Sequence, residues 1–464
     1  MNAALSKKDE HFRDFSLNGA MGSVIAYVCV PLALYQSLNQ VFKILDTMMA
    51  AHIGASAVSA VAYLSQINMM LSALGGGLAI GASIKVSEAY GAGDFELVKK
   101  RVSTMFALCG ILGAALLLIL VPTTPQFLRM MKTPEEFIAD GTTYFILELF
   151  GLVITFFNNV YIAIERARGN SKRILWLNMG VIAVKLALTA VFVYALNGGI
   201  NMISTATIIS QGLLLVAAFH NLNAKGNAFG FSAKAVSLKK EVAGPMLVLS
   251  FPVIIEKIAF AMGKVIVNSM STVYGAWTVG ALGISNNIGG ITTNPQAGFQ
   301  EGGSAVISQN LGAGRPDRAM SAFRWVLLYC VAVGGVIMAL SLIFLHQISY
   351  IFAGDNQEFA QMIRDIYKYE AMGAIPLGIN AAVLSLLYGF GRTNITLIMN
   401  FCRVFVFRVP VLWALQHFTS LGNVSAGIVM AVSNIASGVL AAVIGVIEIR
   451  KICRENHISF WKKA

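Results

Sequence analysis

A long internal repeat relates the two halves of this 464-residue chain. Residues 54–93 align without a gap to residues 275–314 at a shift of 221 positions, and twelve of the forty pairs are identical. The same shift pairs Pro31 with Pro252 and Lys43 with Lys264. A shift of 222 continues the repeat through Glu148/Glu370, Gly151/Gly373, Asn158/Asn380, Gly169/Gly391 and Asn178/Asn400. A repeat of this length predicts two similar halves rather than a solenoid of short units.

Composition places both halves in a membrane. The chain is 57% hydrophobic and 12% charged, about half the charge of an average soluble domain. Apolar runs of about 18 residues or more predict membrane-spanning helices. We predict twelve, near 20–50, 56–90, 102–124, 136–164, 174–197, 201–223, 242–271, 277–312, 321–347, 360–388, 394–418 and 423–450.

The predicted fold is therefore an all-α polytopic membrane protein with twelve transmembrane helices in two pseudo-symmetric six-helix lobes. Six spans in each half make the two halves enter the membrane in the same direction, with a central cleft between the lobes. The predicted parts are an N-terminal tail (1–19), an N-lobe (20–223), a linker (224–241), a C-lobe (242–450) and a C-terminal tail (451–464).

The net charge of +12 raises the question of a nucleic-acid partner. We assign 23 of the 34 basic residues to the tails and alternate loops, and only Arg129 and Lys132 to the opposite loops. That asymmetry is the positive-inside rule, and it places both tails and the linker in the cytoplasm. We expect a multi-pass protein of the plasma (inner) membrane, in contact with lipid, monomeric and without a nucleic-acid partner.

The sequence lacks the signatures of an enzyme. Its five cysteines are scattered, and no metal-ligand spacing, phosphate-binding loop or nucleophile elbow stands out. We expect no catalytic residues, no metal site and no cofactor.

Polar residues form matching stripes on two predicted helices that the repeat relates. The first stripe comprises Gln36, Asn39 or Gln40, Lys43 and Asp46. The second comprises Lys257, Lys264 and Asn268, with Glu256 beside them. Spacings of three to four residues place each stripe on one helix face, which cannot face lipid. The two stripes predict a water-filled cavity, which Asn158 and Asn380 would also line. Lys43 and Asp46 could instead simply neutralise each other.

Other repeated residues allow two interpretations each. Glu148 and Glu370 recur in both halves, either as functional acids or as groups needed for folding. Pro31 and Pro252 are either plain kinks or hinges, since proline in a transmembrane helix often serves movement.

Several of these stretches resemble a known family. They are ILDTMMA at 44–50, GAS and GAGD within 81–94, GGS and SQNLGAG within 302–314, and RVP at 408–410. Together they resemble the signature segments of the MATE (multidrug and toxic compound extrusion) family of the oligosaccharidyl-lipid flippase superfamily, over about residues 20–450.

This resemblance implies an exporter of drug-like or metabolic small molecules, driven by inward flow of protons or sodium ions and working by alternating access. It also implies that Asp46 is a cation-coupling residue. The sequence departs from the family pattern in the fifth segment, where Lys185 and Thr189 replace an amide and an acid. We hypothesise that Lys185 pairs with Asp46, so that release of this pair acts as the switch.

The second half departs from the pattern as well. Phe260 and Ile379 or Asn380 stand where sodium-coupled members carry acids, and Asp46 has Val267 as its repeat partner. The intramembrane lysines leave an anionic or zwitterionic substrate open. The alternatives are a lipid-linked saccharide flippase of the same superfamily, or a membrane receptor or scaffold without transport.

Overall fold

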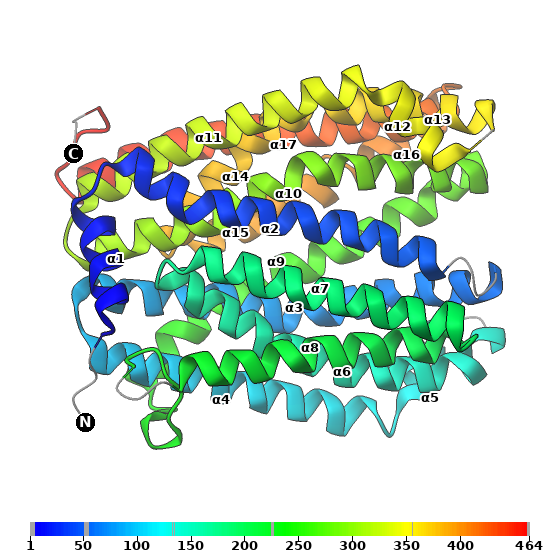
Figure 1. Ribbon diagram of the computed structural model, residues 1–464. Helices are drawn as coiled ribbons and strands as arrows, with labels where there is room; N and C mark the ends of the chain where they lie inside the picture. Colours follow the sequence, from blue (N-terminus) through cyan, green and yellow to red (C-terminus); the bar gives the residue numbers. More distant parts are fainter. Residues whose placement is uncertain are drawn as a thin grey trace. The chain divides into compact units, whose positions relative to one another are not determined.

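The computed structural model describes residues 5–50, 55–131, 133, 135–223, 227–354 and 356–461, without the side chains of 43–50, 55–63, 135–137, 139–140 and 276. The described residues are almost all helical, which confirms the all-α prediction (Figure 1). The first half contains α1 (Lys7–Asn18), α2 (Met21–Ala50), α3 (Ala55–Ala92), α4 (Phe95–Leu120), α5 (Thr124–Met130), α6 (Glu135–Ala167), α7 (Ser171–Ala190), the π-helix η1 (Val191–Ala195) and α8 (Ile200–Leu222).

The second half has the same succession of long helices, with more breaks. It contains η2 (Ala233–Ala235), α9 (Lys240–Ser271), η3 (Thr272–Tyr274), α10 (Ala276–Gly312), α11 (Pro316–Ile343), α12 (Leu345–Ala353), α13 (Gln357–Ala371), α14 (Ala374–Gly389), α15 (Thr393–Phe405), α16 (Val409–Phe418) and α17 (Val424–Glu455).

Membrane-spanning character is widespread in the described part of the chain. Ten of its helical segments are long and apolar enough to cross a bilayer, and the pair α13 and α14, bent by 46°, is an eleventh. The predicted segment 277–312 is α10, whose 37 residues would reach about 55 Å at 1.5 Å per residue. It falls outside that set because polar residues such as Asn286, Asn287 and Asn294 interrupt its apolar sequence.

Two segments predicted as continuous are broken. The predicted segment 360–388 consists of α13 and α14, and 394–418 consists of α15 and α16. Proline explains both breaks, because it has no N–H to donate to the carbonyl four residues earlier. Pro376 stands at the start of α14, and Pro410 at the start of α16.

The predicted N-terminal tail contains the helix α1, and its first part is anchored by hydrogen bonds. Arg13 donates to the carbonyl oxygens of Tyr90 (3.0 Å) and Gly91 (2.8 Å), and the Tyr90 hydroxyl donates to the carbonyl of Asp9 at 2.5 Å. Hydropathy alone could not reveal this helix, because polar and charged residues outnumber the apolar ones in α1.

The chain forms two compact units whose limits differ from the predicted lobes. The first contains Met1–Asp14 and Val41–Ile258, and the second contains Phe15–Gln40 and Ala259–Ala464. The N-terminal part of α2 thus belongs to the second unit, and the N-terminal part of α9 belongs to the first. The two long helices each change unit along their length.

Glycines that the repeat relates explain why part of α2 packs within the second unit and part of α9 within the first. In the first unit, a Cβ on Gly77 would lie 2.7 Å from the Cα of Ile254 in α9. In the second unit, a Cβ on Gly298 would lie 2.6 Å from the backbone nitrogen of Ala33 in α2. Glycine is therefore required at both positions so that the helices can approach closely.

A repeated hydrogen bond strengthens each of these contacts. The Ser250 hydroxyl donates to the carbonyl of Leu78 at 3.2 Å, and the Cys29 thiol donates to the carbonyl of Phe299 at 3.8 Å. Both residue pairs are related by the shift of 221. The repeat therefore preserves the packing of an exchanged helix half in each unit.

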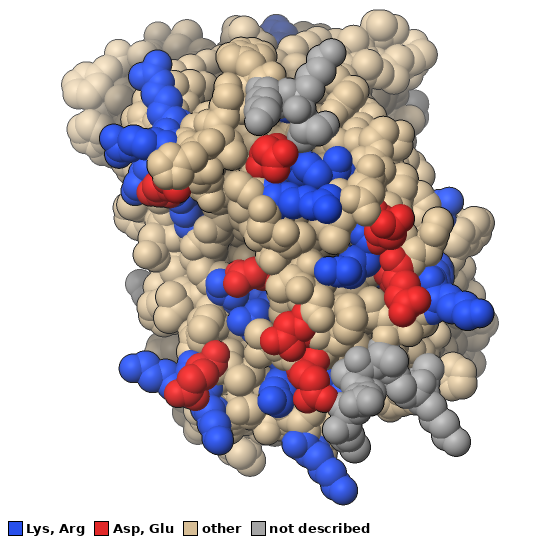
Figure 2. All heavy atoms as spheres, turned by 90° about the vertical axis from the view of Figure 1, so that its left-hand side faces the viewer, with Lys and Arg blue, Asp and Glu red and all other residues tan. Residues whose placement is uncertain are grey.

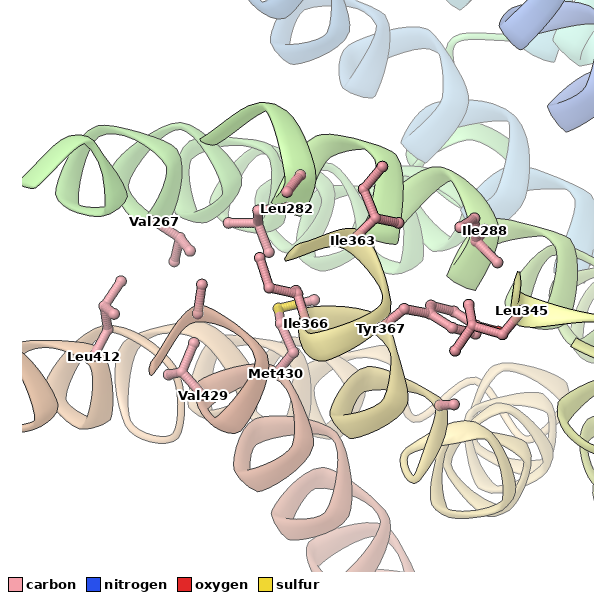
Figure 3. Close-up of a cluster of buried hydrophobic side chains, with 13 residues drawn as sticks. Val267, Leu282, Ile288, Leu345, Ile363, Ile366, Tyr367, Leu412, Val429 and Met430 are labelled. Carbon is pink, nitrogen blue, oxygen red and sulfur yellow. The ribbon is translucent and has the colours of Figure 1, made fainter. Parts of the chain in front are cut away.

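The second unit has a buried apolar cluster that joins six helices (Figure 3). Its members are Val267, Ala281, Leu282, Ile288, Leu345, Ile363, Ile366, Tyr367, Ala371, Leu412, Ala426, Val429 and Met430. Through Leu412 it holds α16, the second piece of the broken span, against α17. This cluster is the apolar support for the polar groups of the same unit.

Candidate functional site

The predicted cation-coupling group lies only partly within the described structure. The side chains of Lys43 and Asp46 are outside the described residues. Lys185 is half-buried on α7, and Thr189, one turn further, is fully buried. The Thr189 hydroxyl has no hydrogen-bond partner among the described residues. The Lys185–Asp46 pair therefore stays a prediction.

The polar stripe on α2 makes its contacts through Gln40. The side-chain nitrogen of Gln40 donates to the backbone and side-chain oxygens of Asn287, each at 3.2 Å. Asn294 in turn donates to the Gln40 side-chain oxygen at 3.1 Å. Gln36 and Asn39 are half-buried on the same helix. The sequence left Asn39 and Gln40 as alternatives in this stripe. Gln40 is the one whose hydrogen bonds join α2 to α10 within the second unit.

The two repeated acids occupy comparable positions, each bonded to a serine hydroxyl. Glu148 on α6 accepts from Ser204 at 2.7 Å and from Asn68 at 2.6 Å. Glu370 at the end of α13 accepts from Ser285 of α10. Gly289 makes room for the Glu370 carboxylate, since a Cβ there would lie 2.6 Å from its oxygen.

Glu370 stands among basic side chains. Arg408, Lys264 and Arg403 are its electrostatic partners, with Arg408 the strongest. Arg403 and Arg408 both donate to the side-chain oxygen of Asn434, at 3.1 and 3.2 Å. These three cations come from α9 and from either side of the break between α15 and α16.

Further contacts fix the two arginines. Arg408 is buried and donates to the Ser433 hydroxyl at 3.1 Å. The guanidinium of Arg403 lies 5.2 Å from the ring centre of Phe260, and the Lys264 ammonium lies at the same distance from that ring. Both distances are within the range of cation–π attraction. Phe260 thus contacts two cations.

The remaining predicted residues occupy varied environments. Asn158 is buried and donates to the side-chain oxygen of Gln211 at 2.7 Å, which joins α6 to α8. Asn380 is buried on α14 and Glu256 on α9, while Asn268 is half-buried. Pro31 and Pro252 are buried within α2 and α9, which continue through them. Their role as hinges stays a prediction.

Arg403 and Arg408 were the residues that the predicted site omitted. Their signal in the sequence is the charge itself, because two arginines inside an apolar segment need protein partners. Within the described part of the chain, no three His, Cys, Asp or Glu side chains come together as metal ligands. Around Glu370, the described charged side chains of the second unit are Arg408, Lys264 and Arg403.

Comparison with known proteins gives consistent matches. The MatE family model matches residues 31–194 and 252–414, one stretch in each half, with starts 221 positions apart. The probable multidrug resistance protein YoeA of Bacillus subtilis is 25% identical over 401 residues, which cover 84% of this chain and 86% of that protein. The probable multidrug resistance protein NorM of Thermotoga maritima is 22% identical and covers 85% of each.

Solved structures share the fold. A MATE protein in complex with MaL6 superimposes with a TM-score of 0.90 at 19% identity, covering 97% of this chain and 100% of that one. A MOP superfamily transporter from Pyrococcus furiosus, described as having a binding pocket of reverse polarity, gives a TM-score of 0.89 at 19% identity, with coverages of 97% and 99%. These matches confirm the predicted polytopic fold and the resemblance found in the sequence.

Proposed function

This chain belongs to the MATE family of multidrug efflux transporters, and on that basis we propose that it is a secondary active exporter. It exchanges drug-like or metabolic small molecules for inward-flowing protons or sodium ions by alternating access. The protein needs no cofactor beyond the coupling ion, and it acts as a monomer in the plasma membrane.

The observation that carries this proposal is the set of charged side chains inside the predicted spans. Arg403 lies ten residues from the start and fifteen from the end of the span Thr393–Phe418, which is about 15 and 22 Å along a helix. A charge at the centre of a bilayer costs at least about 2.5–3.5 kcal/mol. Membrane proteins retain such charges chiefly along a substrate or ion path.

Ion coupling is assigned to the first half. A carboxylate such as Asp46 can be free, protonated or ion-bound, and each state changes the charge within the helix. Lys185 competes with the incoming ion for that carboxylate. Replacement of Lys185 by the ion as the partner of Asp46 would then favour one conformation of α2 over another. Pro31 in α2 and its counterpart Pro252 in α9 supply the hinges for this change.

Both ends of the chain are assigned to the cytoplasm. Basic side chains, with acidic ones among them, are spread over the face of the molecule that Figure 2 shows. The excess of Lys and Arg in the tails and alternate loops supports this orientation through the positive-inside rule.

The test is dye transport in proteoliposomes under an imposed gradient of protons or of sodium ions. We expect at least one dye from a panel of cations and anions to move in the direction opposite to the flow of protons or of sodium ions. We expect this movement to stop when an ionophore dissipates the ion gradient. Failure of every dye to respond to either gradient would overturn the exporter proposal.

A second test addresses the coupling pair. We expect Asp46→Asn to abolish gradient-driven efflux and Lys185→Met to change its dependence on pH. Lys172→Met, at the start of α7, is the matched control and should keep the wild-type profile. If Lys185→Met retains full efflux with an unchanged pH profile while Asp46→Asn abolishes it, the pair is not the switch.

A further inference from the structure

The last helix of the second unit is longer than the apolar core of a bilayer. α17 (Val424–Glu455) has 32 residues, which is about 48 Å at 1.5 Å per residue, whereas the hydrocarbon core is about 30 Å thick. Even at the average tilt of about 20°, part of α17 lies beyond this core. We propose that the C-terminal end of α17 binds the headgroup of an anionic phospholipid, with Arg450 and Arg454 as the binding residues.

One face of α17 changes from apolar to basic toward its C-terminal end. Val443 and Ile447 are exposed, and Arg450 and Arg454 are the next exposed side chains on the same face. Spacings of four, three and four residues place all four in one row along the helix. An exposed apolar row suits lipid chains, and an arginine at its end keeps its charged head in water or among headgroups. The change therefore marks the level at which α17 leaves the apolar core.

The acidic residues of this helix end are bound by a different arginine. Arg392, which immediately precedes α15, forms ion pairs with Glu448 and, at 2.5 Å, with Glu455. Among the described residues, no ion pair joins Arg450 or Arg454 to an acid. The acids nearest in sequence therefore leave the two exposed arginines with positive charge that an external anion can balance.

The chain reverses direction directly after α17. His457 adopts the left-handed conformation, with a φ of 53°. The backbone N–H of Ile458 donates to the carbonyl of Cys453 at 3.0 Å. A left-handed residue with this hydrogen bond is the Schellman motif, which ends many helices. The residues that follow the motif therefore fold back instead of continuing away from α17.

Phe460 holds this returning segment against α11. Its ring centre lies 6.5 Å from that of Phe323 and 5.9 Å from the guanidinium of Arg324. Trp461 contacts the Phe460 ring edge-on and is itself 80% exposed. Tryptophan is enriched where membrane and water meet. A tryptophan that is held exposed, a few residues after two exposed arginines, is suited to the headgroup region.

The chemistry of these groups favours an anionic phospholipid over other ligands. A guanidinium binds phosphate oxygens through a fork of two hydrogen bonds. In phosphatidylcholine the choline cancels the phosphate charge, whereas phosphatidylglycerol keeps it. Each basic residue near an anionic membrane surface contributes about a fivefold gain in affinity. The exposed Val443 and Ile447 also give the acyl chains an apolar surface, which free phosphate would not use.

The inference goes beyond the proposed function, because it requires that α17 crosses the membrane and not that the protein exports anything. Its test is native mass spectrometry of the full-length protein, titrated in micelles with dioleoyl phosphatidylglycerol or dioleoyl phosphatidylcholine. We expect the wild type to bind phosphatidylglycerol more tightly than phosphatidylcholine. Arg450→Gln and Arg454→Gln should each weaken phosphatidylglycerol binding about fivefold, and the double variant about twenty-five-fold.

Control variants separate this site from the general charge of the protein. Lys239→Gln removes one exposed positive charge from the first unit and should bind phosphatidylglycerol as the wild type does. The double variant Arg450→Lys with Arg454→Lys keeps both charges and should retain most of the affinity. Trp461→Ala should weaken the binding of both lipids alike, because it removes no charge. All substituted side chains are exposed, so the variants should fold.

Three results would overturn the site. They are equal affinity of the wild type for the two lipids, unchanged phosphatidylglycerol affinity in the double glutamine variant, and a loss in Lys239→Gln as large as that in Arg454→Gln. Inorganic phosphate at the concentration of the lipid should not displace phosphatidylglycerol. Displacement would assign the arginines to soluble anions instead of lipid. Because no transport is measured, these results and the dye-transport test of the exporter proposal fail or succeed separately.

Discussion

Glu148 and Glu370 hold corresponding positions in the two halves, yet different side chains surround them. Asn68 and Ser204, both neutral, donate hydrogen bonds to Glu148. Glu370 accepts from Ser285 and also interacts with Arg408, Lys264 and Arg403. At the shift of 222, the positions of Arg403 and Arg408 correspond to Val181 and Leu186.

The comparison separates scaffold from chemistry. Glycine contacts, a helix exchanged between units and an acid bonded by serine occur in both halves. The two arginines and the break between α15 and α16 occur in one. The repeat therefore accounts for the shared glycine contacts, and Arg403 and Arg408, which have Val181 and Leu186 at the corresponding positions, account for a difference in charge.

The largest expected effect tests the shared scaffold. Gly77→Leu and Gly298→Leu should each destabilise the protein by about 3 kcal/mol, because their new Cβ atoms would meet helix backbone that cannot move aside. Gly76→Leu is the control, since a Cβ there has nothing within 4 Å. Thermal unfolding in detergent measures all three. A normal melting temperature for either glycine variant would show that the close approach is not needed.

The next effect tests the difference between the acids. Glu370→Gln should cost about 3–5 kcal/mol, because it removes the negative charge from a buried group of cations. Glu148→Gln should cost about 1–3 kcal/mol, the range for disturbing buried hydrogen bonds. Unfolding in mixed micelles measures both losses. Equal losses would mean that the cations around Glu370 contribute nothing to stability.

The smallest effect tests the part that both acids share. Ser204→Ala and Ser285→Ala each remove one hydroxyl donor from a carboxylate, and each should cost about 1 kcal/mol. The same unfolding experiment applies. A loss from Ser285→Ala as large as that from Glu370→Gln would assign the stability of that site to the hydroxyl rather than to the charges.

Much of the fold could be predicted from the sequence because helical spans and the repeat leave local signals. The repeated glycines at 77 and 298 were visible, but their partners were not, since a glycine does not indicate which helix approaches it. The exchange of α2 and α9 between the units thus required coordinates. The break at Pro410 was recognisable in principle from the missing N–H.

The candidate site was predicted less completely. The polar stripe on α2 correctly identified one face, but adjacent residues such as Asn39 and Gln40 differ by only about 100° around a helix, so spacing could not choose between them. Asn434 gave no signal, because one asparagine in an apolar helix resembles any other. Its importance follows from the two arginines that meet it.

A double-mutant cycle on Glu370 and Arg408 tests the central claim, that Glu370 belongs to a coupled group of charges in the second half. The single variants Glu370→Gln and Arg408→Met and the double variant are unfolded in mixed micelles, with Glu148→Gln and Leu186→Met as the repeat-related control cycle. We predict that the double variant loses about 1–3 kcal/mol less than the sum of the single variants, while the control cycle is additive. Additivity within about 0.5 kcal/mol for Glu370 and Arg408 would contradict the claim.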